Sequence, residues 1–368
     1  MKSLYSRNLG RFAAALLACA GSLTVCAQGG LPVFPYAGGW LGADAAYSVP
    51  LGPGHSVWLF GDTFAGRSAA RTRAATTMVR NSVGLSDCTP GKACTMHYYW
   101  RKQKTAKPRS FFDSGREDVW YWPLDGFFDG HALYLVLTEV RNRPNAEKTD
   151  ALGFEITGTR WARVSNPLAP PNAWHVEMQP LTTGNLMPGV SIVADGDFLL
   201  LYTEVDEGQG KGYTAVIRVP LAHLDEPLRH CEYFGQDHAW HSGLPAQDAL
   251  RVIDQPISEM SVRYHPSIRK WVAVSFAPGF LTHDLVTRTA DSAVGPWTEP
   301  EKFYAAAEMI PTQPHYDRET FCYAAKEHIE FGEDRLVVTY VCNSFSFDKV
   351  TRDLGLYRPE IVTVPLPR

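Results

Sequence analysis

Five apolar runs of similar composition recur along this chain at nearly regular intervals, and this repetition limits the folds that are open to it. The runs begin at His55, His131, Asp197, Arg269 and Asp334, so that successive starts lie 65 to 76 residues apart. Each run follows a turn and is rich in Val, Leu, Tyr, Phe and Trp, which is the composition of a β-strand. Internal repeats of this length indicate a fold built from equivalent units.

A further strand is predicted before each of these runs. The five inner strands are GADAAYSV (42–49), EDVWYWPL (117–124), GVSIVADG (189–196), EMSVRYHP (259–266) and FCYAAKEHIEF (321–331). Each unit is long enough for one four-stranded blade with generous loops. We therefore predict an all-β fold, a five-bladed β-propeller in a single domain over residues 28–368. The segment LPVFPY (31–36) is expected to add a strand to the last blade. A two-sheet sandwich is the alternative, but sandwiches of this length usually divide into domains and no linker is present.

The N-terminus has the pattern of a secretion signal. A basic segment, MKSLYSRNLGR, precedes the apolar FAAALLACAGSLTVCA, and Val25–Ala27 fits a small-residue cleavage site. Residues 1–27 are thus predicted to be a signal peptide. An alternative interpretation makes Leu16–Cys19 the cleavage box of a lipoprotein. In both cases the mature protein is expected to be exported, either periplasmic or secreted, and no later segment is long and apolar enough to span a bilayer.

Export permits disulfides, and five cysteines follow the predicted signal. Cys88 and Cys94 flank a turn sequence, while Cys322 and Cys342 lie on the two strands of one expected hairpin, so both pairs are predicted to form disulfides. Cys231 is left over and is expected to be buried. The alternative is that all five are free thiols. Metal binding is not expected, because no CxxC or HExxH spacing occurs.

Charge and motifs exclude several classes of partner. The 368 residues carry a net charge of -4, and the 35 Lys and Arg residues are scattered. The chain therefore has no electrostatic footprint for nucleic acid or an anionic membrane. A GxSxG elbow and a Gly-rich phosphate loop are both missing, which argues against a serine hydrolase and a nucleotide enzyme. We expect a neutral or weakly polar ligand, no cofactor, and a monomer as the simplest state.

Two aspartates lie in the first predicted hairpin, GADAAYSVPLGPGHSVWLFGDTF (42–64). If Gly52–Gly54 forms the turn, paired residue numbers sum to about 106, and Asp44 falls opposite Asp62 with Cβ atoms roughly 4.5–5.5 Å apart. Like charges in such positions are destabilising, so a shared proton, a bound cation or a catalytic role must offset the cost. The alternative is that each aspartate merely caps a turn.

Glycoside hydrolysis uses such a pair directly. One carboxyl group protonates the leaving oxygen while the other activates water or attacks the anomeric carbon. Mutual repulsion separates the two titrations and leaves one group protonated and one ionised near neutral pH. We predict Asp44 and Asp62 to be the catalytic pair, with Asp44 as the base and Asp62 as the proton donor.

Further candidates for contacts to substrate surround this pair in the predicted propeller. Trp120 and Trp122 alternate in one strand and so face the same side, where aromatic rings can stack on sugars. Glu204 lies at the end of its predicted strand, as Asp62 does. Glu259 lies at the start of an inner strand, as Asp44 does. Glu139 has the same position as Glu204 in its own unit but is expected to be a solvated strand end. The predicted substrate-binding residues are Arg80, Asn81, Trp120, Trp122, Glu204, Glu259, Lys326 and His328. The alternative for each is structural, as core packing, a solvated strand end or an anchor for the acids.

Several segments resemble glycoside hydrolase family 183, formerly domain of unknown function 4185. They are FGDTF, whose aspartate follows the first by eighteen positions, RNSVG (80–84), GPWTEP (295–300) and YRPEIV (357–362). GPWTEP also resembles segments of the five-bladed propeller glycosidases of families 43, 32 and 62. The resemblance implies a five-bladed propeller with its active site at the centre of one end, endo-acting D-arabinanase activity, and Asp44 and Asp62 as catalytic acids. Ala45–Tyr47 replaces the Leu-Gly-Ile often seen there, which points to a sibling group.

The function predicted from the sequence is therefore a secreted glycoside hydrolase that cleaves a furanose-containing, D-arabinan-like polysaccharide. A carbohydrate-binding propeller without turnover is the alternative. A third hypothesis makes Asp44 and Asp62 a structural calcium site.

Overall fold

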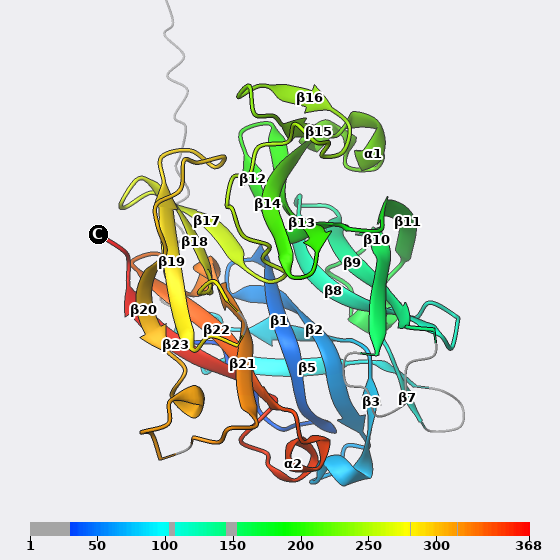
Figure 1. The fold of residues 1–368 in the computed structure, drawn as a ribbon. Coiled ribbons are helices and arrows are strands. Elements are labelled where there is room, and N and C mark those ends of the chain that lie inside the picture. Colours follow the sequence, from blue (N-terminus) through cyan, green and yellow to red (C-terminus); the bar gives the residue numbers. More distant parts are fainter. Residues whose placement is uncertain (1–29, 103–106, 145–152, 280, 315) are drawn as a thin grey trace, which may run out of the picture.

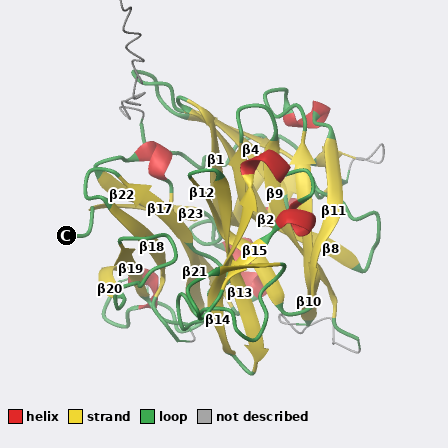
Figure 2. Cartoon of the chain, turned by 90° about the horizontal axis from the view of Figure 1, so that it is seen from above, coloured by secondary structure: helices red, strands yellow, loops and turns green. Residues whose placement is uncertain are grey.

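The chain forms a ring of five blades around a central axis, as the repeats predicted (Figure 1). The computed structural model describes residues 30–102, 107–144, 153–279, 281–314 and 316–368. The predicted signal peptide lies outside these residues. Strands make up most of the described structure, and the few helices are short (Figure 2). No described helix has the length and apolar character needed to cross a membrane.

Each blade is an antiparallel sheet whose first strand lies nearest the axis. Blade 1 contains β1 (Trp40–Gly52), β2 (His55–Gly66), β3 (Thr76–Val79), β4 (Ser82–Asp87) and β5 (Thr95–Tyr99). Blade 2 contains β8 (Val119–Phe128), β9 (Leu133–Asn142), β10 (Phe154–Val164) and β11 (Val176–Thr183). Blade 3 contains β12 (Leu186–Asp195), β13 (Phe198–Gly208), β14 (Lys211–Pro220), β15 (Glu232–Phe234) and β16 (Trp240–Ser242).

The remaining blades are smaller. Blade 4 contains β17 (Ser261–His265), β18 (Lys270–Phe276), β19 (Asp284–Ala290) and β20 (Glu301–Ala305), and blade 5 contains β21 (Thr320–Glu327), β22 (Arg335–Ser344) and β23 (Pro359–Pro365). The other elements are the ribbon of β6 (Arg101–Lys102) and β7 (Pro108–Arg109) and the helices α1 (Pro227–His230) and α2 (Phe347–Arg352). In every blade the inner strand and the next strand are antiparallel neighbours, so the start of one lies beside the end of the other. We call the end of the ring where inner strands begin the site end.

Side chains on the inner strands join neighbouring blades by accepting backbone N–H groups. The contacts are Asp125 Oδ2 to Ile192 N (2.8 Å), Ser191 Oγ to Val262 N (2.8 Å) and Ser261 Oγ to Glu327 N (2.7 Å). In blades 3 and 4 the residue whose N–H is accepted, Ile192 or Val262, directly follows the serine of the same blade. In blade 5 the corresponding donor is Glu327, so the residue at the equivalent position is Lys326. We call Asp125, Ser191, Ser261 and Lys326 the axial series. All four are buried, but a lysine ammonium has no acceptor to offer.

The prediction that residues 31–36 add a strand to the last blade is wrong. Residues 31–36 form no strand, and β23, from the C-terminus, is the outermost strand of blade 5. Pro32 and Pro35 explain the difference, because a proline cannot donate to a sheet ladder. The segment instead packs its side chains, and the Phe34 ring lies edge-on to Trp58 with centroids 5.0 Å apart.

Arg73 links the first blade to the last. Its guanidinium is buried and donates hydrogen bonds to backbone carbonyl oxygens from both ends of the described chain. The acceptors are Leu41, Val350, Asp353 and Leu356. One side chain thus satisfies carbonyl groups that would otherwise be buried without partners.

Both predicted disulfides are present, Cys88–Cys94 and Cys322–Cys342, and Cys231 is a buried free thiol as expected. The second disulfide joins β21 to β22 at directly paired positions. Disulfides are compatible with an extracellular protein.

Replacing Arg73 with methionine is expected to lower the free energy of unfolding by about 3–5 kcal/mol, because several buried carbonyl groups lose a charged donor at once. Urea unfolding followed by circular dichroism measures the change. Arg71→Met is the matched control, since Arg71 is exposed and bonds only to nearby residues of its own loop. Equal stability losses in the two variants would contradict the assigned role of Arg73.

Candidate active site

Asp44 lies near the start of β1, where the pairing with β2 becomes irregular. The predicted sum of 106 holds from Tyr47 to Pro50, but one residue of β1 then faces two of β2, which makes a β-bulge. The flanking pairs are Ala45 with Phe60 and Ala43 with Thr63. Asp44 therefore faces the Gly61–Asp62 step, and the predicted one-to-one pairing with Asp62 is wrong in this detail.

The bulge depends on unusual backbone geometry directly after Asp44. Ala45 and Ala46 both have positive φ angles, 65° and 60°, in a region that L-residues rarely occupy. On the facing strand, a Cβ atom at Gly61 would lie 2.4 Å from Asp44 Oδ1, so any larger residue there would displace the Asp44 carboxyl group. Such backbone strain is typical of functional sites, where the surrounding structure must hold it in place.

The carboxyl group of Asp44 is held by two tyrosines from blade 5. Its Oδ2 accepts hydrogen bonds from the Tyr323 hydroxyl at 2.7 Å and the Tyr357 hydroxyl at 3.0 Å. Burial and, after it, the negative charge of Asp62 raise the pKa of Asp44 to about 7, although the Tyr323 hydrogen bond opposes the shift. Asp44 is thus partly protonated near neutral pH.

Asp62 has a different set of partners. Its Oδ2 accepts from Arg80 Nη1 at 2.9 Å, and its Oδ1 accepts from the Trp122 indole N–H at 2.8 Å. Burial raises the pKa of Asp62 above its ordinary value, and the Arg80 charge and the Trp122 hydrogen bond offset part of this rise. Both donors favour the ionised carboxylate. Of the two acids, Asp62 has the environment of a base and Asp44 that of a proton donor, which is the reverse of the roles assigned from the sequence.

The two tryptophans share one face, as their alternation predicted. Their rings meet edge to face with centroids 5.9 Å apart. Trp122 bonds Asp62, and the guanidinium of Arg80 lies 4.3 Å from the centroid of the Trp120 ring. Arg80, Trp120 and Trp122 therefore form one assembly around Asp62.

Glu259 and Lys326 form a further charged pair at the site end. Lys326 Nζ lies 2.9 Å from Glu259 Oε1 and also donates to the Ala324 carbonyl oxygen. The ammonium packs 4.2 Å from the centroid of the Tyr47 ring. Lys326 is almost fully buried, which lowers its pKa, whereas Glu259 is partly exposed. The Glu259 charge in turn raises the pKa of Asp44, so this pair acts on the catalytic candidate.

Glu204 also lies at the site end, because it pairs with Met187 at the start of β12, and its charge contributes to the raised pKa of Tyr47 in blade 1. Burial raises the pKa of Glu204 to about 7, with a smaller effect from Asp206. Its Oε2 is buried and has no hydrogen-bond partner among the described residues. Glu139, by contrast, accepts from Arg160 and Thr157, and is an ion-paired strand end.

Two of the predicted substrate contacts are buried anchors. The Asn81 side chain is bonded to the backbone of Phe112 and Tyr121, and so it holds the loop that follows β7. The His328 ring lies between the hydroxyls of Ser48 and Thr339, each at 2.7 Å. Both side chains direct their polar atoms to the protein, which makes them supports of the site rather than groups presented to a ligand.

The groups around the two aspartates do not fit the hypothesis of a structural calcium site. Both oxygens of Asp62 accept hydrogen bonds, and one of them from a guanidinium that would repel a cation. Among the described residues, the one His, Cys, Asp and Glu cluster with suitable spacing is Glu308 with Cys322 and Cys342, whose sulfurs are joined in a disulfide.

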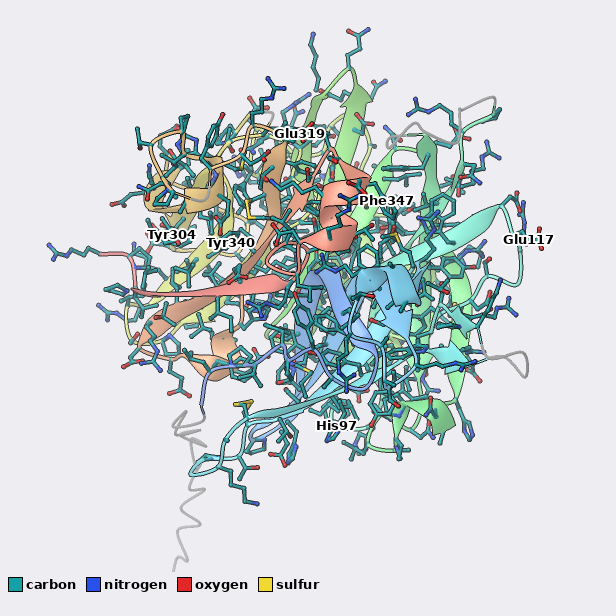
Figure 3. The ribbon with its side chains drawn as sticks, turned by 90° about the horizontal axis from the view of Figure 1, so that it is seen from below. His97, Glu117, Tyr304, Glu319, Tyr340 and Phe347 are labelled. Atoms are coloured by element: carbon teal, nitrogen blue, oxygen red, sulfur yellow. A yellow bond between two sulfur atoms is a disulfide. The ribbon has the colours of Figure 1, made fainter. Side chains whose placement is uncertain are left out.

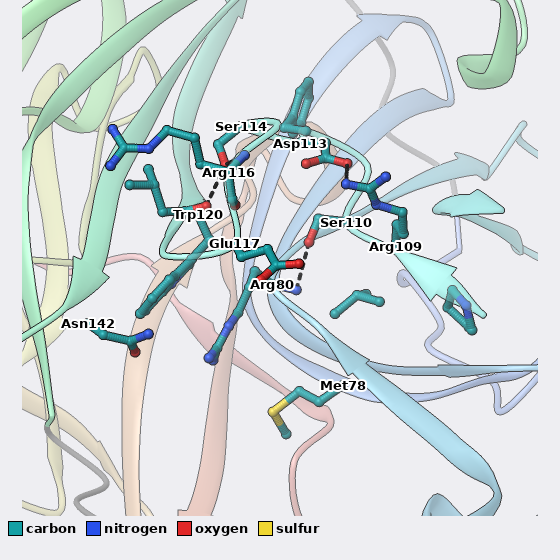
Figure 4. Close-up of a pocket in the computed structure, with 14 residues that line it drawn as sticks. Met78, Arg80, Arg109, Ser110, Asp113, Ser114, Arg116, Glu117, Trp120 and Asn142 are labelled. Atoms are coloured by element: carbon teal, nitrogen blue, oxygen red, sulfur yellow. Dashed lines mark hydrogen bonds and ion pairs between the residues drawn. The ribbon is translucent and has the colours of Figure 1, made fainter. Parts of the chain in front are cut away.

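A cavity of about 220 Å³ lies between β3 and the start of β8. Figure 4 shows Arg80, Trp120, Glu117 and Asn142 among the residues around it. Because Arg80 lines this cavity and also bonds Asp62, one side chain connects the cavity with that aspartate.

The tyrosines that hold Asp44 are the main residues that the sequence analysis missed. Tyr357 lies in the YRPEIV segment and Tyr323 in an expected inner strand, so both were within recognised segments. Neither segment indicated that its tyrosine would contact blade 1. Tyr357 lies 313 residues from Asp44 in the sequence, and Tyr323 lies 279 residues from it.

Comparison with known proteins places the chain in a family. Residues 33–365 match the model of the domain of unknown function DUF5005, and the chain belongs to that family. The narrower resemblance to glycoside hydrolase family 183 is not confirmed by this match. No curated protein matches the chain.

Solved structures support the fold. A Bacteroides ovatus protein described as a "putative hydrolase" is 19% identical with a TM-score of 0.67, covering 88% of this chain and 86% of that one. An endo-arabinase from Bacteroides thetaiotaomicron is 11% identical with a TM-score of 0.46, covering 92% and 98%. A GH43_1 enzyme from Xanthomonas citri is 13% identical with a TM-score of 0.46, covering 93% and 92%. The first likeness shows the five-bladed fold, and the other two are too weak to carry an argument.

The raised pKa of Asp44 makes stability depend on pH. The folded value of about 7 exceeds the unfolded value of about 3.9, so the folded protein binds more protons between these values, and its stability falls as pH rises through 7. Asp44→Asn removes this effect and is expected to raise the free energy of unfolding by about 1–2 kcal/mol at pH 8, and by less at pH 5. Urea unfolding at both pH values tests this, with the exposed Asp334→Asn as control. An equal gain at both pH values would be inconsistent with the proton linkage.

Lys326→Ser tests the link between the axial series and the site. Serine supplies the hydroxyl acceptor found in blades 3 and 4, so the variant is expected to fold, but it leaves Glu259 without its cation. The apparent pKa of Asp44 should then rise by about one unit, because nearby negative charge is no longer balanced. Carboxyl titration by carbon-13 NMR measures the shift. Lys270→Ser, at an exposed ion pair, is the control, and an unchanged Asp44 titration in Lys326→Ser would refute the coupling.

Proposed function

We propose that this protein is an exported glycoside hydrolase that cleaves a furanose-containing, D-arabinan-like polysaccharide with Asp44 and Asp62. The observation that carries the proposal is the placement of these two carboxyl groups at the same end of the ring with opposite surroundings. Asp44 is held by neutral hydroxyls and has a pKa near 7, whereas Asp62 is held by a guanidinium and an indole N–H. Glycoside hydrolysis requires one protonated and one ionised carboxyl group.

The proposed roles follow from these surroundings. Asp44 protonates the glycosidic oxygen as the bond to the leaving sugar breaks. Ionised Asp62 removes a proton from the attacking water or attacks the anomeric carbon itself. Arg80 and Trp122 keep the Asp62 carboxylate oriented, and Tyr323 and Tyr357 do the same for Asp44. The furanose preference rests on the resemblance of the hairpin to family 183.

A panel of polysaccharides, including D-arabinan and L-arabinan, with detection of new reducing ends tests the proposal. Asp44→Asn and Asp62→Asn are each expected to lower kcat/KM at least about 10³-fold, because each removes a group that acts only in the transition state. Asp334→Asn, on an exposed hairpin at the opposite end, is the matched control. Near-wild-type activity in either site variant would refute the pair. Glycan affinity without new reducing ends would instead support the carbohydrate-binding alternative.

A further inference from the structure

The cavity lined by Arg80, which bonds Asp62, is a second place where the chain offers a binding surface. Its walls come from β3, from the 108–117 segment, from the first residues of β8 and from the end of β9. Its volume of about 220 Å³ is below the roughly 300–1,000 Å³ of pockets for drug-sized ligands, so it suits a single sugar ring. Arg80 is one of the residues around the cavity (Figure 4), and its guanidinium bonds Asp62.

Most charges around this cavity are already paired. Arg80 is bound to Asp62, Arg109 lies 2.7 Å from Asp113, and Arg116 lies 2.7 Å from Asp118. The carboxylate of Glu117 makes no ion pair with another described residue. It is exposed, and Figure 3 shows it at the margin of the molecule. The uncompensated charge on the cavity wall is therefore negative.

The cavity wall also contains a buried donor. Trp120 is 7% exposed, and its indole Nε1 has no hydrogen-bond partner among the described residues. Buried N–H groups are normally bonded, so an unpartnered one on a residue that lines a cavity is a candidate donor to a ligand or a water. Asn142 adds an exposed amide, which can both donate and accept.

We propose that this cavity is a subsite for one neutral sugar unit, on the Asp62 side of the bond that is cleaved. Sugar hydroxyls both donate and accept, and so match a carboxylate, an amide and an indole N–H. A uronic acid would bring its carboxylate toward Glu117, where like charges repel. The subsite extends the proposed function, because it implies a substrate of at least two sugar units with a neutral residue next to the cleaved bond.

Calorimetric binding to the Asp44→Asn variant tests the subsite without turnover. The probes are neutral arabino-oligosaccharides of two to six units and oligogalacturonates of equal length. Neutral probes are expected to bind more tightly, and Trp120→Phe, which removes the N–H, should weaken their binding roughly ten-fold. Glu117→Gln, which is isosteric, should narrow the preference for neutral over acidic probes roughly five-fold. Glu333→Gln, on the exposed hairpin at the opposite end, is the matched control and should change neither value.

Hydrolysis by the protein with both aspartates intact separates this inference from the proposed function. Tighter binding of the acidic probes, no binding of any neutral probe, or no effect of both Glu117→Gln and Trp120→Phe would overturn the subsite. Since Glu117 is exposed, its variant should fold even if Trp120→Phe does not. Binding that responds to these variants without new reducing ends would overturn the hydrolase and leave the subsite in place.

Discussion

The hydrogen bonds of the axial series are the constraint on which the rest of the structure depends. In blades 2 to 4 a buried Asp or Ser accepts the backbone N–H of the next inner strand, and this fixes the strands relative to one another. The catalytic candidates lie on strands of the same ring, so their positions follow from these contacts. The series changes in blade 5, where Lys326 stands at the next position and turns its ammonium toward Glu259. The position that joins neighbouring blades in blades 2 to 4 therefore brings a buried charge to the site in blade 5.

That charge helps to explain why the two aspartates differ. A buried carboxylate is stable when a cation or several donors compensate it. Asp62 is compensated by Arg80 and Glu259 by Lys326, whereas Asp44 has the hydroxyls of Tyr323 and Tyr357 as its hydrogen-bond partners. Asp44 is thus the acid for which protonation is least unfavourable. The difference between acid and base arises from which carboxyl group has a cation beside it, and pairing within one hairpin does not contain that information.

The parts of the structure that rest on local pattern were predictable from the sequence. The repeats predict the five blades, the alternation of Trp120 and Trp122 predicts their shared face, and hairpin symmetry predicts the Cys322–Cys342 disulfide. The bulge at Asp44 was not predictable, because two alanines at positive φ contradict their own preferences and are held by tertiary contacts. Contacts that exist only once the ring is closed, such as those of Tyr323 and Tyr357 with Asp44, also produce no periodic pattern in the sequence.

Ring closure and the geometry of the site are coupled through the same segment. Arg73 binds the carbonyl of Leu356, and the next residue, Tyr357, donates its hydroxyl to Asp44. Tyr357 itself has a positive φ of 56°, as does Ala324 after Tyr323, so the strained backbone positions gather around one carboxyl group. Strain of this kind persists only where surrounding bonds outweigh it. The arginine that joins the first blade to the last therefore also helps to hold a tyrosine against Asp44, and the hydrogen bonds that orient the Asp44 carboxyl group exist only in the closed ring.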